Sequence, residues 1–236
     1  MFVNTSHNGV DLWAGQPDCQ AAHSQLLAAL KTSSVTFLPS GTALTTRRKG
    51  NLGEFIALTI GCANQFANYR VIAANAHNPL SDNSRTDLDL LWLFFGPVPA
   101  QDIGIVQEVK TTADPKLGYG DSLIEDYAKL FATDPQFTLQ SRFTVAGNKM
   151  EGMGVATDLC CRARELGGIS PSTSPKVRLF PTLVHEKQDA QPVPKLTAVK
   201  STIVTTEGWS ASAVQCSSIS IEQLDARLAR LTWGQP

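Results

Sequence analysis

The chain has no apolar run long enough to cross a bilayer, which takes about 18 residues or more. Its longest apolar run lies within residues 88–95 and has the length of a β-strand. The first residues, MFVNTSHNGVDLW, lack a basic stretch followed by an apolar core, so they do not predict a secretory signal. We therefore expect a cytoplasmic protein without membrane contact.

Clustered metal-binding cysteines are also missing. The five cysteines are an odd number, they are scattered, and no C-x-x-C pair occurs among them. A structural zinc site needs four ligands at short paired spacings, so this pattern favours reduced structural thiols over a zinc cage. The four histidines are equally isolated in sequence, and none of them predicts a ligand set by itself.

An excess of positive charge is missing as well. The chain has 20 Lys and Arg against 21 Asp and Glu, which gives a formal net charge of −1. Proteins that bind nucleic acid unaided usually have a basic excess, because neutralising phosphates supplies most of the non-specific affinity. Any contact with nucleic acid must therefore be local, as at Arg47, Arg48 and Lys49, or be supplied by a partner.

What the chain does contain is an alternation of helical and strand patterns. This alternation predicts an α/β fold with a central mixed β-sheet flanked by helices. At 236 residues the chain fits one domain: residues 1–44 would form an N-terminal helix and strand, 45–133 a core, and 134–236 would complete the sheet or bind a partner. The predicted helices lie within residues 17–31, 45–66, 120–133, 148–168 and 220–231. The predicted strands cover residues 33–41, 68–76, 87–96, 103–112, 175–186 and 200–211.

A few charged residues stand out at the ends of the apolar strands. Glu54 lies in a predicted helix, and Asp89 directly precedes the run LLWLFF. Glu108 and Lys110 lie two positions apart in the strand GIVQEVKTT, so their side chains face the same side. Carboxylates that converge in an apolar setting raise one another's pKa unless a cation joins them. A divalent ion would remove that conflict.

The order of a helical Glu, an Asp at a strand, a Glu-Val-Lys strand and a following helix resembles the PD-(D/E)XK nuclease superfamily, with its restriction-endonuclease-like fold. The segments GNLGEF, TDLDLLWLF and VQEVKTT carry the resemblance, within residues 45–133. The resemblance implies that Asp89 and Glu108 hold Mg²⁺ or Mn²⁺. It also implies that Lys110 orients or helps to deprotonate a water molecule and stabilises the developing charge, and that Glu54 completes the metal site through a water molecule or a second ion.

Some assignments stay open at this point. Asp87 and Asp89 share a face, so either could be the ligand, and neither follows a proline, which is a departure from the family pattern. Asp89 is preferred because it leads directly into the apolar run. The basic residues 47–49 lie at a predicted helix N-terminus, where a substrate phosphate would be favoured, and a solvated basic turn is the alternative. Tyr127 and Lys129 resemble positions from which some family members contact substrate.

Two classes of function follow from these patterns. The resemblance implies a metal-dependent DNA endonuclease, the catalytic subunit of a bacterial restriction or anti-phage defence complex, controlled by a helicase or translocase and acting as a monomer or homodimer. A nuclease on RNA is a variant of the same idea. The alternative is a catalytically silent scaffold or nucleic-acid-binding subunit, in which Lys110 bridges Glu108 and Asp89 without a metal.

Overall fold

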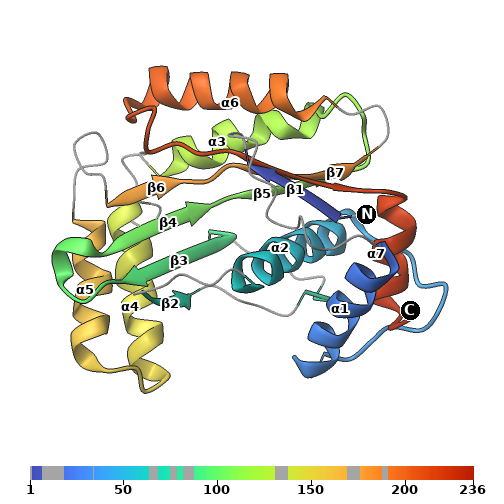
Figure 1. The fold of residues 1–236 in the computed structure, drawn as a ribbon, viewed down its shortest axis with the longest axis horizontal. Coiled ribbons are helices and arrows are strands. Elements are labelled where there is room, and N and C mark those ends of the chain that lie inside the picture. The colour runs from blue at the N-terminus through green and yellow to red at the C-terminus, as the bar shows by residue number, and fades with distance from the viewer. Residues whose placement is uncertain are drawn as a thin grey trace.

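The computed structural model describes residues 2–6, 19–33, 35–63, 69–74, 79–81, 88–130, 138–168, 176–187 and 191–236. In this part of the chain the strands form two four-stranded sheets, with the orders β2-β3-β4-β6 and β1-β8-β7-β5. Helices lie on both sides of them (Figure 1). Each sheet contains parallel and antiparallel pairs, so the predicted α/β class with a mixed, helix-flanked sheet is confirmed.

The bounds of the elements are as follows. The strands are β1 (Phe2–Ser6), β2 (Arg70–Ala73), β3 (Leu90–Phe95), β4 (Ile103–Gln107), β5 (Val109–Thr112), β6 (Val177–Leu179), β7 (Thr182–Glu186) and β8 (Ser217–Ile221). The α-helices are α1 (Cys19–Thr32), α2 (Thr46–Ala63), α3 (Ser122–Lys129), α4 (Leu139–Gly152), α5 (Thr157–Gly167), α6 (Pro192–Glu207) and α7 (Leu224–Thr232). Two short 3-10 helices are η1 (Pro99–Gln101) and η2 (Gly118–Asp121). Among the described helices, none combines the length and apolar character needed to span a membrane.

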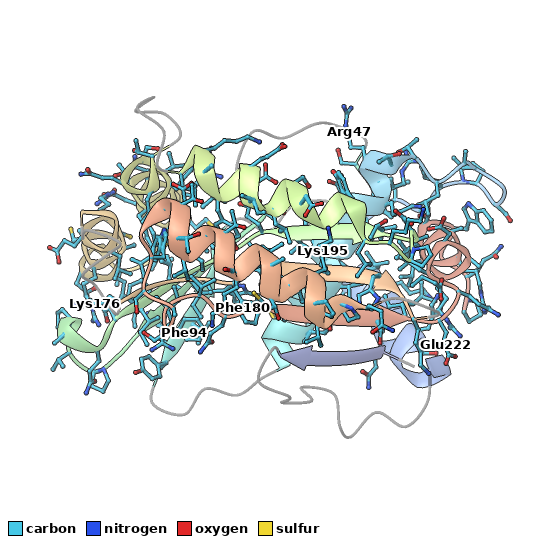
Figure 2. The ribbon with its side chains drawn as sticks, turned by 90° about the horizontal axis from the view of Figure 1, so that it is seen from above. Arg47, Phe94, Lys176, Phe180, Lys195 and Glu222 are labelled. Carbon is cyan, nitrogen blue, oxygen red and sulfur yellow. The ribbon has the colours of Figure 1, made fainter. Side chains whose placement is uncertain are left out.

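Strand β3 is buried on both faces, as its continuous apolar sequence predicts. Leu91 and Leu93 pack into a core that α3, α4, α5 and α6 cover, whereas Trp92 and Phe94 pack into a second core under α1, α2 and α7. Helices α3 and α6 run side by side over one face (Figure 2). Each fully buried side chain of this size contributes about 1.5–3 kcal/mol, so β3 anchors both layers.

The predicted strand 103–112 is divided in two, and so is the predicted strand 175–186. β4 ends at Gln107 and continues in the other sheet as β5 from Val109, while β6 and β7 are divided in the same way at Phe180 and Pro181. Proline has no amide to donate, which explains the second break. We call the junction between the two sheets the seam. A main-chain hydrogen bond spans it, because the amide of Thr182 donates to the carbonyl of Glu108 at 2.9 Å.

A buried polar network fills the seam between the sheets. The Trp92 indole donates to the side-chain oxygen of Gln107 at 2.7 Å, and the Gln107 amide donates to the Thr182 hydroxyl at 2.9 Å. That hydroxyl lies 2.9 Å from the hydroxyl of Ser217. Since buried polar groups are costly when unpaired, this chain of partners fixes how β3, β4, β7 and β8 meet.

Other boundaries differ from the sequence predictions. Residues 35–39 form no strand, and the predicted strand 200–211 lies mostly in α6. The predicted helix 148–168 is two helices, α4 and α5, separated at Gly154, whose φ of 75° ends regular helix. The predicted helix 220–231 begins only at Leu224, because Ser220 belongs to β8.

The start of α7 is held by a residue distant in sequence. The Glu186 carboxylate accepts hydrogen bonds from the amides of Gln223 and Leu224, at 2.9 and 2.7 Å. A carboxylate from β7 therefore satisfies two free amides at the start of the helix.

Candidate active site

Asp89 is placed by the pairing of β3 with β4. In this antiparallel pair Leu90 lies opposite Gln107, and continuing the register by one residue brings Asp89 opposite Glu108. The Asp89 carboxylate accepts a hydrogen bond of 2.7 Å from the amide of Val109. This contact ties the beginning of β3 to the beginning of β5, so the Asp89 side chain faces the seam between the two sheets.

Glu108 occupies the seam itself, between β4 and β5, and only 4% of its surface is exposed. Its amide donates to the Tyr127 hydroxyl at 3.2 Å, and that hydroxyl donates to the carbonyl of Val106 at 3.1 Å. Tyr127 comes from α3 and is fully buried. It therefore positions the backbone that carries Glu108, and substrate contact by Tyr127 stays an untested prediction.

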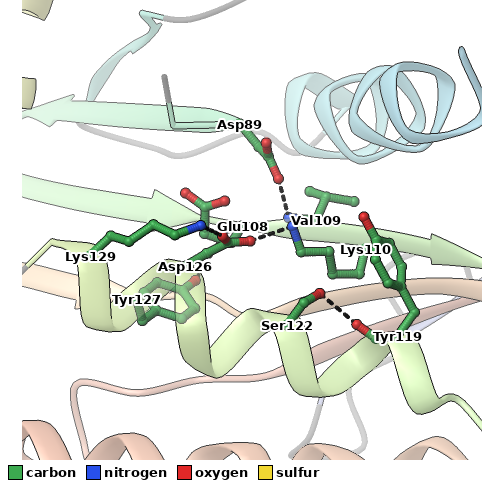
Figure 3. Close-up of polar contacts among 9 residues, drawn as sticks. All are labelled: Asp89, Glu108, Val109, Lys110, Tyr119, Ser122, Asp126, Tyr127 and Lys129. Atoms are coloured by element: carbon green, nitrogen blue, oxygen red, sulfur yellow. Dashed lines mark hydrogen bonds and ion pairs between the residues drawn. The ribbon is translucent and has the colours of Figure 1, made fainter. Parts of the chain in front are cut away.

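Lys110 extends from β5 into the same space as the two carboxylates. Its ammonium group forms an ion pair with Asp126 of α3, whose other oxygen lies 2.6 Å from the ammonium of Lys129 (Figure 3). Lys110 is largely buried, whereas 63% of the Lys129 side chain is exposed. The Asp126 carboxylate thus contacts both the buried ammonium of Lys110 and the exposed ammonium of Lys129.

The charges of this cluster strongly affect one another. Burial raises the pKa of Glu108 well above its usual range, and the negative charges of Asp89 and Asp126 raise it further. Burial also raises the pKa of Asp89, although the Lys110 ammonium opposes this effect. For Lys110 itself, burial favours the neutral amine, but Asp89 and Asp126 outweigh burial and raise its pKa. Lys110 is therefore a cation at neutral pH.

The two carboxyl groups fit what a small divalent cation requires. Asp89 and Glu108 lie opposite each other where the register of β3 and β4 is continued, and burial raises the pKa of both carboxyl groups. Mg²⁺ is usually held by one or two carboxylates, with water and substrate phosphate completing its shell. In the described part of the chain, no group of three or more His, Cys, Asp or Glu side chains is arranged to hold a metal. A metal site at the pair Asp89 and Glu108 stays a prediction.

Glu54 lies on α2, which packs directly against β5. The neighbouring Gly53 approaches so closely that a Cβ built on it would lie 1.8 Å from the Thr111 hydroxyl oxygen. Glu54 is half-buried on the helix that covers the strand carrying Lys110. Its part in a metal site stays a prediction, and Asp87, the alternative to Asp89, lies outside the described residues.

The basic residues at the start of α2 have different surroundings. Arg48 is buried and donates to the carbonyls of Leu80 and Ala43, at 3.3 and 3.1 Å. Lys49 forms an ion pair of 2.7 Å with Asp225. Arg47 is exposed and projects outward at the edge of the molecule (Figure 2). Substrate binding by these residues stays a prediction, and Arg47 is the one whose side chain faces solvent.

Two residues of this site were missed in the sequence. Asp126 carries no strong signal, because a carboxylate three positions before a lysine usually forms a surface pair within its helix. Tyr119 lies 5.7 Å from the Lys110 ammonium, measured to the centre of its ring. The signal for Tyr119 is the triplet Gly-Tyr-Gly at residues 118–120, which places an aromatic residue in a turn.

Comparison with known proteins adds no relative to these observations. No family model, no curated protein and no solved structure matches this chain. The function is therefore inferred from the geometry of Asp89, Glu108 and Lys110 and from the ion pair between Lys110 and Asp126.

Proposed function

We propose that this chain is a metal-dependent nuclease that hydrolyses phosphodiester bonds in DNA, on a restriction-endonuclease-like core. The observation that carries the proposal is the convergence of the Asp89 and Glu108 carboxyls with the Lys110 ammonium at the seam of the sheets. The order of the elements supports it, because the helix of Glu54, the strands of Asp89 and Glu108, and the helix α3 follow one another as the resemblance implies.

Each residue of the cluster has a defined task in this proposal. Asp89 and Glu108 would hold Mg²⁺ or Mn²⁺, which polarises a phosphoryl group and lowers the pKa of bound water. Lys110 is held as a cation, so it would bind a non-bridging phosphate oxygen and stabilise the negative charge that develops there. Asp126 keeps that ammonium directed toward the seam. Lys129, at the exposed end of the cluster, would meet the DNA backbone.

Control by other proteins completes the proposal. The net charge of −1 gives little general attraction to DNA. We therefore propose a cytoplasmic catalytic subunit of a restriction or defence complex that a helicase or translocase delivers to DNA, with homodimerisation as the route to cutting both strands. This part rests on the family resemblance and on the missing basic excess.

The test is cleavage of supercoiled plasmid DNA in Mg²⁺, Mn²⁺ or EDTA. Glu108→Gln and Lys110→Ala should each lower the rate at least about a hundredfold, as the loss of a charge-stabilising group does in enzymes. The exposed neighbours Glu125→Gln and Lys116→Ala are matched controls and should retain the wild-type rate. Equal rates in Glu108→Gln and Glu125→Gln would refute the assigned site.

A metal-free scaffold is the second candidate, and one observation favours it. Lys110 already has a carboxylate partner in Asp126, so part of the charge is balanced without a metal. Manganese separates the two functions: a nuclease site should gain thermal stability as Mn²⁺ is added, because binding only to the folded state stabilises it. A wild-type protein whose melting temperature is unchanged by Mn²⁺ and which cuts no DNA would be the scaffold.

A further inference from the structure

Tyr119 lies next to Lys110 of the proposed active site. It belongs to η2, between β5, which carries Lys110, and α3, which carries Asp126 and Lys129. About half of its side chain is exposed, 51%, and it is the only aromatic residue among the exposed large hydrophobic side chains of the described chain. Its ring lies beside the Lys110 ammonium (Figure 3). A flat apolar surface and a cation thus face the same space.

The backbone of the turn that contains Tyr119 is held in one conformation. Leu117 is buried and has a left-handed φ of 54°, a conformation that a leucine adopts only when its surroundings hold it there. The amide of Gly120 donates to the Leu117 carbonyl at 2.9 Å, and the Ser122 hydroxyl donates to the Tyr119 carbonyl at 2.7 Å. The backbone of the turn is therefore ordered while the aromatic ring is left in solvent.

The Tyr119 ring and the Lys110 ammonium suit two parts of one nucleotide, its base and its phosphate. A phosphate that binds the Lys110 ammonium brings the adjoining nucleoside toward the Tyr119 ring. Stacking on an aromatic side chain suits every base, because each base has a π-face. We infer that Tyr119 stacks on an unpaired base next to the phosphate bound at Lys110, which makes single-stranded DNA, flaps or frayed ends the substrate. This inference rests on the proposed nuclease function.

Paired DNA does not offer the same contact. In a duplex each base is stacked on its neighbours and paired inside the helix, so reaching the ring would require unstacking at a cost of a few kcal/mol. Phosphate contacts such as those of Lys110 and Lys129 are common to single and double strands and do not distinguish them. The preference for unpaired DNA therefore depends on the ring.

Binding can be measured separately from cleavage. The full chain carrying Glu108→Gln is titrated into a fluorescent single-stranded oligothymidylate, and into the same strand paired with its complement. In this background Tyr119→Ala should weaken single-strand binding roughly five- to a hundredfold, the usual effect of losing one stacked base. Duplex binding should change less than about twofold. Tyr119→Phe retains the ring and should bind both probes as tightly as its parent does.

The outcomes separate this inference from the nuclease itself. Undiminished single-strand binding in Tyr119→Ala, an equal loss on both probes, or no single-strand binding by the parent would each overturn the role of the ring. Val145→Ala, at another exposed apolar position on α4, is the matched control and should change neither affinity. Ring-dependent binding by a wild-type chain that cuts no DNA would uphold the role of Tyr119 and refute the hydrolysis.

Discussion

Asp89 and Asp126 together keep the amine of Lys110 charged. Asp126 binds Lys110 on one side and Lys129 on the other, and with Asp89 it raises the pKa of Lys110 despite burial. An amine that keeps its proton contributes positive charge and cannot accept a proton from water. Among the roles that the sequence left open for Lys110, this favours charge stabilisation over deprotonation of the attacking water.

Glu108 is a source of instability that the proposed function requires. Its carboxyl is buried beside Asp89 and Asp126, and this raises its pKa. Glu108→Gln removes the charge and retains the shape, so in EDTA at pH 7 we expect the free energy of unfolding to increase by about 1 kcal/mol. The melting temperature, measured by scanning fluorimetry, should rise by about 2–4 °C.

The control for this prediction is a carboxylate that is exposed to solvent. Glu125 is exposed on α3, so Glu125→Gln should change the free energy of unfolding by less than about 0.5 kcal/mol. A Glu108→Gln protein that melts below the wild type in EDTA would show that the carboxyl stabilises the fold, contrary to the argument from burial and repulsion.

The spacing of Glu108 and Lys110 let the sequence indicate a shared space for their charges, and the structure brings them together. Asp89 was within reach of the same reasoning, because it begins the neighbouring apolar strand. Asp126 and Tyr119 could not be identified by this reasoning, because their approach to Lys110 depends on the turn after β5 and on where α3 packs. Neither of these is encoded in local spacing.

Among the elements, α2 packs closely against strands of both sheets. Gly53 lies against Thr111 of β5, and Gly61 lies against Trp92 of β3, where a Cβ would come within 2.4 Å of the indole. Two glycines on one face let the helix approach both strands that flank the site. Gly50, on the same helix, has open space around it, with nothing within 4 Å of a built Cβ.

This contrast predicts opposite effects for the same substitution. Gly53→Ala should destabilise the protein by about 1–3 kcal/mol, because the new methyl group collides with Thr111. Gly50→Ala should stabilise it by up to about 1 kcal/mol, since alanine is the better helix former. Urea unfolding measures both, and a Gly53→Ala chain as stable as Gly50→Ala would contradict the close packing.

Helix α6 shows why some elements escaped sequence reasoning. Its segment is rich in Thr and Val, which favour strands. It is nevertheless helical, because Leu196, Val199 and Ile203 fall on one face and are all buried. The break between β4 and β5 carries no Gly or Pro and lies beside the break at Pro181 in the paired strands β6 and β7, so we infer that the neighbouring strand imposes it. Such an effect of one strand on another leaves no mark in the local sequence.

For the molecule as a whole, buried histidines link stability to pH. His23 of α1 is buried, which lowers its pKa, and the charges of Arg230 and Arg227 on α7 add to the effect. The unfolded chain therefore binds a proton at this histidine more readily than the folded one. The contribution is complete above the ordinary pKa of about 6.5 and is lost as pH falls toward the lowered value.

We expect the two buried histidines to lower the free energy of unfolding as pH falls from about 7 to 5, whereas the raised pKa values of Glu108 and Asp89 act in the opposite direction over the same interval. His23→Leu removes one titrating group, so as pH is lowered over this interval its free energy of unfolding should fall less, or rise more, than that of the wild type. Urea unfolding at several pH values measures the slope. His185 is also buried with a lowered pKa and accounts for part of what remains. Identical slopes in wild type and His23→Leu would contradict this role of His23.

The seam through the Gln107 network has a consequence for control at a distance. Asp89 adjoins β3 of one sheet, Lys110 belongs to β5 of the other, and Glu108 lies between them. Their separations therefore depend on the angle at which the two sheets meet. A protein that bound the outer helices and rotated one sheet against the other would change the spacing of these charges without touching any of them.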